Sequence, residues 1–204
     1  MSVPDRSIDP RIIESAKEEF LRKGFLDASL QEICKNAGVT TGALYKRFKG
    51  KEELFCALVE DTIADLEKVI EKRSLSLVDL TDGELKQAWD MDREYMRWWF
   101  GYLYERFDAM RLLLVCSDGT KYSNFEHEWV ERMSQTTYAY YQEAQRRGLT
   151  KTDISEKEMH VMLSAFWMTI YEPIVHGFSW DEMMRVSDIM CNLFDWYKML
   201  GFER

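Results

Sequence analysis

Residues 29–54 read SLQEICKNAGVTTGALYKRFKGKEEL and predict two short helices joined by a tight turn, followed at once by a third helix. Ser29 begins the first helix and forms the pattern of a capping box with Glu32, three residues later. The apolar residues of this helix recur at helical spacing, at Leu30, Ile33, Cys34 and Ala37. Gly38 follows directly, where a helix most easily ends in a left-handed residue. The stretch therefore predicts a helix-turn-helix unit.

The second short helix has an outward face that is unsuited to a core. Thr40 or Thr41 can cap this helix, and Leu44 with Phe48 supply its inward stripe. At 100° per residue, the arc opposite Leu44 holds Gly42, Tyr45, Lys46 and Lys49. A glycine, a phenol and two ammonium groups on one exposed face favour contact with a polyanion.

Each outward residue has a physical role if the partner is DNA. Gly42 costs about 1 kcal/mol relative to alanine in a helix, which indicates a close approach of something to the backbone. Hydroxyl groups such as that of Tyr45 can donate to phosphate oxygens, and Lys46 can reach a phosphate or a guanine edge. Lys51, near a helix N-terminus, is expected to hold a phosphate together with free backbone N–H groups. The predicted DNA-binding residues are Ser29, Thr40, Thr41, Gly42, Tyr45, Lys46, Lys49 and Lys51. The alternative is a solvated helix whose lysines bind nothing.

Residues 10–54 resemble the N-terminal DNA-binding domain of TetR-family transcriptional regulators. The resemblance is carried by Ile13, Ala16, Phe20, Gly24, Phe25, Ile33, Ala37, Gly38, Val39, Gly42, Leu44, Tyr45, Phe48, Lys51, Glu53 and Leu54. Lys46-Arg47 stands where the family often has an aromatic or histidine pair, so base preference does not carry over. Gly50 stands where Ser or Asp often caps the next helix, which predicts a weaker cap here.

The charge of the chain divides unevenly between its two parts. The formal net charge is −9, but residues 1–53 hold ten Lys/Arg and nine Asp/Glu, which leaves 17 and 27 for the rest. Four of the six residues 46–51 are basic. Because local charge at the contact surface sets phosphate affinity, the acidic total does not exclude DNA.

Several classes of protein and site are disfavoured. The four cysteines show no metal-finger spacing, and Cys34 and Cys56 lie on apolar stripes, so we expect them to be reduced core residues. The histidines, at 127, 160 and 176, have no zinc spacing either, so no metal and no cofactor is expected. No nucleophile elbow or phosphate loop occurs, and no catalytic residue is predicted. The chain start has no signal-like apolar run and no segment is long enough to span a membrane, so a soluble cytoplasmic protein is expected.

The pattern along the chain predicts an all-α fold, with no segment that alternates like a strand. An N-terminal three-helix helix-turn-helix domain, 1–53, precedes a helical ligand-sensing and dimerisation domain, 54–204. Beyond the opening stretch, helices are expected over 10–24, 51–73, 82–105, 122–147, 156–177 and 180–201, with a joint over 74–82 and a break at Asp118-Gly119. Capping boxes are expected at Thr81/Glu84, Ser155/Glu158 and Ser179/Glu182.

The second part is rich in large apolar side chains. All seven tryptophans and eleven of the twelve methionines lie beyond residue 85. Most of these are expected to be core, but the resemblance implies a small-molecule cavity. The residues proposed to line it are Trp99, Tyr102, Tyr138, Phe166 and Trp167. Glu94, Glu105 and Asp108 could pair with a cationic ligand, or form a solvated acidic face.

The last two expected helices, 156–177 and 180–201, predict a homodimer interface. They are rich in Met, Phe, Trp and Ile, and two copies about a two-fold axis would bury this surface in a four-helix bundle. The resemblance implies the same mode of dimerisation. Pro173 is expected to kink the first of these helices or to end its regular part.

The resemblance implies a ligand-responsive regulator that binds a palindromic operator in double-stranded DNA as a homodimer. Repression relieved by an unidentified small-molecule effector is the default for the family, and activation stays open. One alternative is a helical small-molecule-binding enzyme or carrier in which the N-terminal unit is purely structural. A second alternative is a helical adaptor that binds a protein through residues 40–51.

Overall fold

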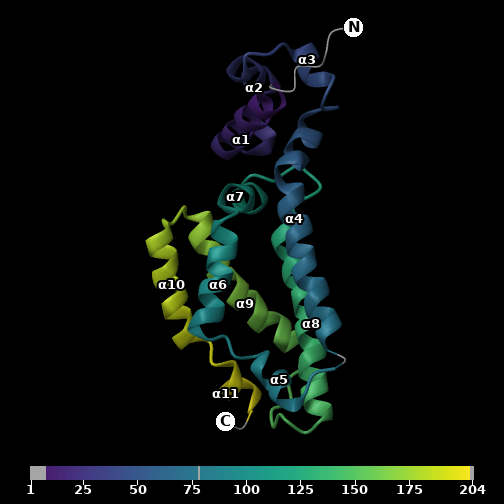
Figure 1. Cartoon of the computed structure of the whole chain (residues 1–204), viewed down its shortest axis with the longest axis vertical. Helices are drawn as coiled ribbons and strands as arrows, with labels where there is room; N and C mark the ends of the chain where they lie inside the picture. Colours follow the sequence, from purple (N-terminus) through teal and green to yellow (C-terminus); the bar gives the residue numbers. More distant parts are fainter. Residues whose placement is uncertain (1–7, 78, 203–204) are drawn as a thin grey trace. The chain divides into compact units, whose positions relative to one another are not determined.

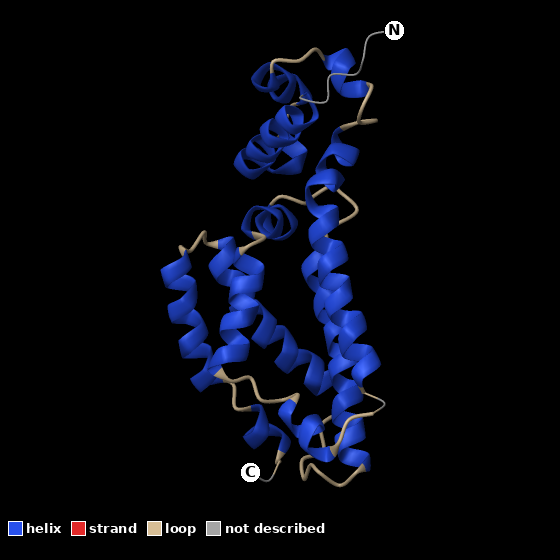
Figure 2. Cartoon of the chain, viewed as in Figure 1, coloured by secondary structure: helices blue, strands red, loops and turns tan. Residues whose placement is uncertain are grey.

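The structure is a computed structural model that describes residues 8–77 and 79–202, without the side chains of residues 8 and 73–76. Every regular element in this part of the chain is a helix, which confirms the all-α prediction (Figures 1 and 2). The helices are α1 (Ile8–Asp27), α2 (Leu30–Ala37), α3 (Thr41–Tyr45), α4 (Lys51–Ser76), α5 (Asp82–Gln87), α6 (Arg93–Tyr104), α7 (Phe107–Val115), α8 (Phe125–Arg146), α9 (Glu156–Val175), α10 (Trp180–Leu193) and α11 (Trp196–Leu200). No described helix combines the length and apolar character that a membrane crossing needs.

The chain packs into two compact units. The first unit comprises residues up to 65 together with 106–125, and the second comprises 66–105 together with 126–204. The boundary falls inside α4, and α7 with the turn after it belongs to the first unit. The predicted domains, 1–53 and 54–204, divide the chain by function, whereas the two units divide it by packing. The predicted division therefore stays a prediction.

The first unit is built around phenylalanine rings from α1 and α4. Phe20, Phe25 and Phe55 pack with centroids 5.2–5.9 Å apart, and all three are buried. Helix α7 packs against α1. The Phe25 N–H donates to the Cys116 carbonyl at 2.9 Å, and Lys17 pairs with Asp108 at 3.3 Å. Residues from the middle of the chain therefore brace the helix that supports α2 and α3.

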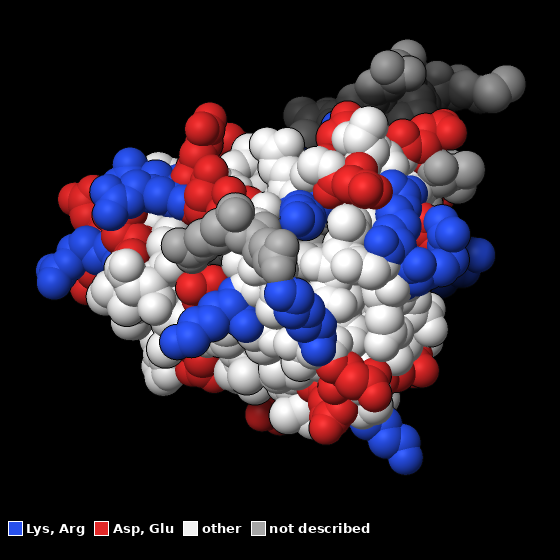
Figure 3. All heavy atoms as spheres, turned by 90° about the horizontal axis from the view of Figure 1, so that it is seen from below, with Lys and Arg blue, Asp and Glu red and all other residues white. Residues whose placement is uncertain are grey.

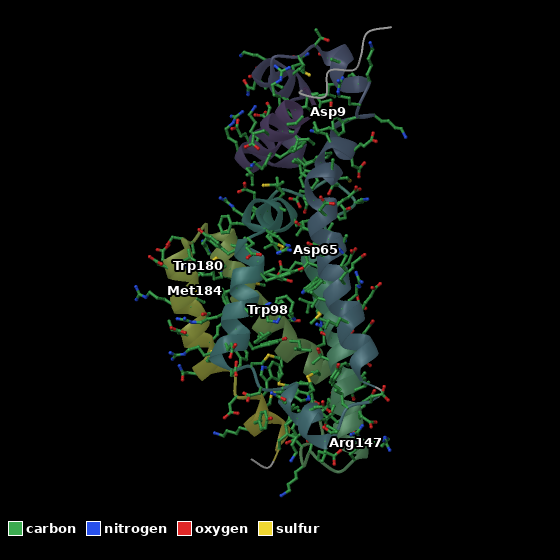
Figure 4. All side chains as sticks on the ribbon, in the orientation of Figure 1. Asp9, Asp65, Trp98, Arg147, Trp180 and Met184 are labelled. Atoms are coloured by element: carbon green, nitrogen blue, oxygen red, sulfur yellow. The ribbon has the colours of Figure 1, made fainter. Side chains whose placement is uncertain are left out.

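The second unit has an aromatic core, as its composition predicts. Trp167 meets Trp99 and Trp129 edge to face, with centroids 5.1 and 5.6 Å apart. Helix α10 packs against α6 and α9, and a Cβ on Gly101 would lie 3.6 Å from the ring of Trp180 (labelled in Figure 4). A Cβ at this distance would make an ordinary van der Waals contact, so the ring of Trp180 packs directly on α6.

The end of α8 is tied to the start of α5 by one arginine. Arg147, labelled in Figure 4, donates to the Leu80 carbonyl at 2.7 Å and to the Asp82 carboxylate at 3.0 Å. Arg147 and Arg146 both bond to Glu143, and these two guanidinium groups lower the pKa of the Glu143 carboxyl to about 2. On the face seen in Figure 3, acidic and basic side chains are interspersed among uncharged ones, so no field of one sign covers it.

The long helices predicted over 82–105 and 180–201 are both wrong, because an aspartate interrupts each. Helix α5 ends at Gln87, and α6 begins after Asp92, whose side chain accepts from the Tyr95 N–H at 2.8 Å. Helix α10 ends at Leu193, and Asp195 caps α11 by accepting from the Lys198 N–H at 3.0 Å. An aspartate side chain competes for backbone donors and starts a new helix instead of continuing the old one.

Most of the predicted helix ends are confirmed. The three capping boxes at Thr81, Ser155 and Ser179 are all present. Gly24 leaves helical geometry inside α1, with φ 74°, as its predicted role as a helix end requires. Pro173 lies inside α9, which continues to Val175. Of the predicted joint over 74–82, residue 78 and the side chains of 74–76 lie outside the described residues.

Candidate nucleic-acid interface

Helix α3 is fixed at its start and on its inner side. Thr40 has an extended backbone, and its Oγ1 accepts from the Ala43 N–H at 3.2 Å, so the predicted cap is Thr40. Leu44 is fully buried and anchors α3 in the first unit. With one face fixed by Leu44, the opposite face of α3 has to point outward.

The residues predicted for the outward face are indeed exposed. Tyr45 is 53% exposed, and Gly42, Lys46 and Lys49 are exposed as well. Thr40 and Thr41 are also exposed, at the start of the helix. The structure therefore confirms that these six residues are accessible. Their contact with DNA stays a prediction.

The turn between α2 and α3 sets the orientation of that face. Gly38 ends α2 with φ 64°, and its N–H donates to the Lys35 carbonyl at 3.2 Å. The Val39 N–H donates to the Cys34 carbonyl at 2.9 Å. Ser15 of α1 donates from its hydroxyl to the Ile33 carbonyl at 3.0 Å, which attaches α2 to α1. The turn thus follows the left-handed glycine that the sequence predicts.

The capping box predicted for Ser29 and Glu32 does not form. The Ser29 side chain makes no cap bond, and Ser29 is half-buried. Its backbone N–H instead donates to the Glu19 carboxylate at 3.2 Å, while Glu32 approaches Lys35 at 3.5 Å. A carboxylate from α1 satisfies the donor that a local cap would otherwise take.

Glu19 is a buried anion that the sequence reasoning missed. Its side chain is 1% exposed and bonds to Lys23 at 2.9 Å and to Arg22. Burial alone would raise the pKa of its carboxyl, but the bonds from Lys23, the Ser29 N–H and Arg22 outweigh burial and lower that pKa. The helical spacing of Arg22 and Lys23 after Glu19 was the only local signal.

Lys51 makes contacts within the first unit, and its predicted contact with DNA stays a prediction. Its ammonium donates to the carbonyls of Leu26 and Ala28 at 2.9 and 3.1 Å, and lies 4.7 Å from the centroid of the Phe25 ring. These contacts join the exit of α1 to the start of α4. The ammonium group that is predicted to hold a phosphate therefore also bonds within the first unit.

Two further contacts shape the interface. Arg47 donates to the Asp9 carboxylate (Asp9 is labelled in Figure 4) and, at 3.1 Å, to the Ala43 carbonyl, so it joins α3 to the start of α1. The Lys49 N–H donates to the Glu53 carboxylate. This bond supports the start of α4 where Gly50 offers no side-chain cap.

Comparison with known proteins identifies this architecture. The model of the bacterial regulatory proteins of the tetR family matches residues 12–58, which span α2 and α3. The transcriptional repressor AcnR of Corynebacterium glutamicum is 23% identical over 183 residues, which are 88% of each chain. Residues 12–58 therefore form a domain of the TetR family. This family consists of transcriptional regulators, in agreement with the prediction of a DNA-binding regulator that is not an enzyme.

Solved structures of transcriptional regulators share the fold over most or all of the chain. SCO3833 of Streptomyces coelicolor A3 superposes with a TM-score of 0.62 at 18% identity, and the match covers 100% of this chain and 94% of that one. FadR of Bacillus subtilis, solved in complex with stearoyl-CoA, gives a TM-score of 0.53 at 17% identity. At these identities the likeness concerns the fold alone.

The five residues predicted to line a ligand cavity lie in or beside the aromatic core of the second unit. Trp99, Phe166 and Trp167 are buried. Tyr102 stacks on Trp98, and the Tyr138 hydroxyl donates to the Ile154 carbonyl at 3.3 Å. Two cavities of about 510 and 610 Å³ lie in this unit, and none of the five residues lines either of them. Their role in ligand binding stays a prediction.

Three carboxylates and the histidines were the remaining candidates for site chemistry. Asp108 pairs with Lys17 in the first unit, whereas Glu94 and Glu105 are exposed residues of the second. The rings of His127 and His160 are 6.2 Å apart. Among the described residues, no group of three or more His, Cys, Asp or Glu is placed to hold a metal ion.

Proposed function

We propose that this chain is a ligand-responsive repressor that binds a palindromic operator as a homodimer, through the outward face of α3. The observation that carries the proposal is the exposure of Gly42, Tyr45 and Lys46 on a helix fixed from behind by Leu44. A rigid helix with this face suits the major groove, which admits an α-helix. The repressor AcnR, similar over most of its length, supports repression.

The contacts with DNA divide into two kinds. Tyr45, Thr40 and Thr41 donate to phosphate oxygens and set the position of α3 on the duplex. Lys46 and Lys49 supply positive charge, and Lys46 reaches base edges. Arg47 is bonded to Asp9 and Ala43, so we assign it a positioning role within the protein.

Exposed apolar side chains on α9 and α10 support the dimer. Val161 and Met168 of α9 are 66% and 44% exposed, and they are seven residues apart, on one face of the helix. Ile189 and Leu193 of α10 are 63% and 64% exposed, and they are four residues apart. A second copy would bury these faces in a four-helix bundle and place two α3 helices about 34 Å apart, one helical turn of DNA.

The second unit is the proposed sensor. FadR, solved in complex with stearoyl-CoA, supports the proposal that a protein of this fold binds a small-molecule ligand. Helix α4 runs through both units, so a change in the second unit can be transmitted to the first along it. An effector releases DNA only if it binds one arrangement of the units more tightly than the other.

The test is fluorescence anisotropy with duplexes from the region upstream of the protein's own gene. A DNA-binding dimer gives two protomers per duplex and an affinity that falls steeply between about 50 and 200 mM salt. A mass measurement on the complex gives the stoichiometry. Failure to bind any fragment in a selection from genomic DNA would overturn the proposal.

A further inference from the structure

Two of the three histidines meet in the second unit although they are far apart in the sequence. His127 is in the first turn of α8, and His160 is the fifth residue of α9. Their imidazole rings meet edge to face, with centroids 6.2 Å apart and an angle of 81° between the planes. His127 is exposed and His160 is half-buried, so the pair is open to solvent. The fold thus creates a pair that the spacing of the histidines in the sequence does not show.

The distance between the two rings suits a single metal ion. A zinc–nitrogen bond is about 2.0–2.1 Å long, which puts the centroid of a bound imidazole about 3.2 Å from the ion. Two imidazoles on one ion therefore have centroids about 5.2 Å apart at the tetrahedral angle and about 6.4 Å apart when they are opposite. The observed 6.2 Å lies inside this range. Rotation of the two side chains, without movement of α8 or α9, is enough to aim both rings at one ion.

The pair differs from the third histidine in its partners. The Nε2 atom of His176 lies 2.9 Å from the carboxylate of Glu172, four residues earlier. In the described part of the chain, no side chain forms a hydrogen bond or an ion pair with the imidazole of His127 or of His160. A metal ion binds the lone pair of a neutral imidazole nitrogen. The ring nitrogens of the pair are therefore available to such an ion.

A glutamate lies one helical turn from each member of the pair. Glu131 follows His127 by four residues on α8, and Glu156 precedes His160 by four residues on α9. Each glutamate is exposed and lies on the same face of its helix as the histidine. Their negative charge attracts a cation, and carboxylates are common hydrogen-bond partners of metal-bound imidazoles. Among the described residues no third His, Cys, Asp or Glu joins the pair in a metal-binding geometry, so two imidazoles are the protein ligands.

We propose that His127 and His160 form a two-histidine site for a divalent transition-metal ion of the class of nickel, copper and zinc. Imidazole nitrogen suits these ions, whereas magnesium and calcium prefer oxygen ligands. A structural zinc site has four protein ligands, and half as many ligands supply about half of its binding free energy. We therefore expect a dissociation constant of about 1–200 µM, with water completing the coordination. The proposal does not rest on DNA binding and is tested without DNA, so the two proposals fail separately.

Isothermal titration of nickel chloride into the chain without a histidine tag tests the site. We expect one nickel ion per chain, with a dissociation constant in the range above, and no measurable binding of magnesium chloride. At a nickel concentration ten times the dissociation constant, the melting temperature is expected to rise by about 3–6 °C. Equal affinity for nickel and magnesium would indicate a diffuse acidic surface. That result, or a lack of nickel binding up to millimolar concentration, would overturn the proposal.

Three single variants locate the ion. His127→Gln and His160→Gln each remove one imidazole, and each is expected to weaken nickel binding at least about tenfold. His176→Gln is the matched control, because His176 is exposed, lies in the same unit and pairs with Glu172, so it is expected to leave the affinity unchanged. Melting temperatures without nickel show whether each variant folds, and exposed His127→Gln is expected to melt within about 1 °C of wild type. Equal losses in all three variants, or an unchanged affinity of His127→Gln, would reject the site.

Modification of the histidines by diethyl pyrocarbonate gives a second readout. A nitrogen that is bound to a metal ion is not free to react with this reagent. Saturating nickel is therefore expected to slow modification of His127 and His160 at least about threefold, as measured by peptide mass spectrometry, and to leave the rate at His176 unchanged. Equal protection of all three histidines, or no protection while nickel is bound, would show that the ion binds elsewhere.

Discussion

Replacing Lys51 with methionine separates a structural role from a DNA-binding one. Methionine keeps the aliphatic stem and removes the ammonium. The change deletes two hydrogen bonds, to the Leu26 and Ala28 carbonyls at 2.9 and 3.1 Å, and the contact with the Phe25 ring. These contacts join α1 to α4, so their loss acts on the stability of the first unit.

The size of the effect follows from the exposure of the group. A bond from a charged donor contributes about 1.5–3 kcal/mol when buried. Lys51 is half-buried and partly screened by water, so we take about 1 kcal/mol for each bond and about 2 kcal/mol in all. For a chain of this size, that lowers the melting temperature by about 4–8 °C.

Urea unfolding and thermal melting measure the change, with Lys46→Met as the matched control. Lys46 is exposed and is expected to change the free energy of unfolding by less than about 0.5 kcal/mol. If Lys51→Met leaves stability unchanged and only weakens DNA binding, the ammonium contacts phosphate and the structural assignment is refuted.

Three further variants, two single and one double, lead to testable predictions. The pKa of the Glu19 carboxyl is lower in the folded protein than in the unfolded chain, where it is about 4.3. The ionised carboxylate therefore stabilises the fold above about pH 4.3, and this stabilisation is lost as the pH falls through the lower folded pKa. The difference in unfolding free energy between wild type and Glu19→Gln is therefore largest at neutral pH, and a difference that grows in acid would contradict this. Gly38→Ala is expected to lower the free energy of unfolding in urea by about 1–2 kcal/mol, because alanine is strained at a φ of 64°. The added Cβ itself has room, since it meets only Arg11 Nη1, at 3.6 Å. An unchanged urea midpoint would show that there is no such strain. The double variant Val161→Glu, Leu193→Glu is expected to be monomeric in sedimentation, because it places charges on the proposed dimer interface. The control Gln142→Glu, on α8, is expected to leave the dimer intact. A double variant that stays dimeric would show that the interface lies elsewhere.

Local signals in the sequence predicted the turn after α2, the cap of α3 and the exposed face of α3. Gly38 and Thr40 act on backbone groups within four residues of themselves, so their positions were enough to set the turn and the cap. The outward face followed from the period of the helix once Leu44 was taken as core. The three capping boxes at Thr81, Ser155 and Ser179 were predicted for the same reason.

Contacts between distant residues were the ones that the sequence did not reveal. The Ser29 N–H bonds to Glu19, ten residues earlier, and Lys51 bonds to carbonyls 23 and 25 residues earlier. A local sequence pattern does not show whether a backbone N–H bonds to a nearby side chain or to one that is distant in the sequence. The cavity of about 510 Å³ is a stronger case, because its lining from residues 89–92 and 191–197 comes together only through the packing of α10 against α6.

The central claim is that the outward face of α3 binds DNA without contributing to the core. The most direct test measures the DNA affinity and the melting temperature of Tyr45→Ala together. Tyr45 is 53% exposed, so the account predicts at least about a tenfold loss of affinity with a melting temperature within about 1 °C of wild type. A large fall in melting temperature, or an unchanged affinity, would contradict it.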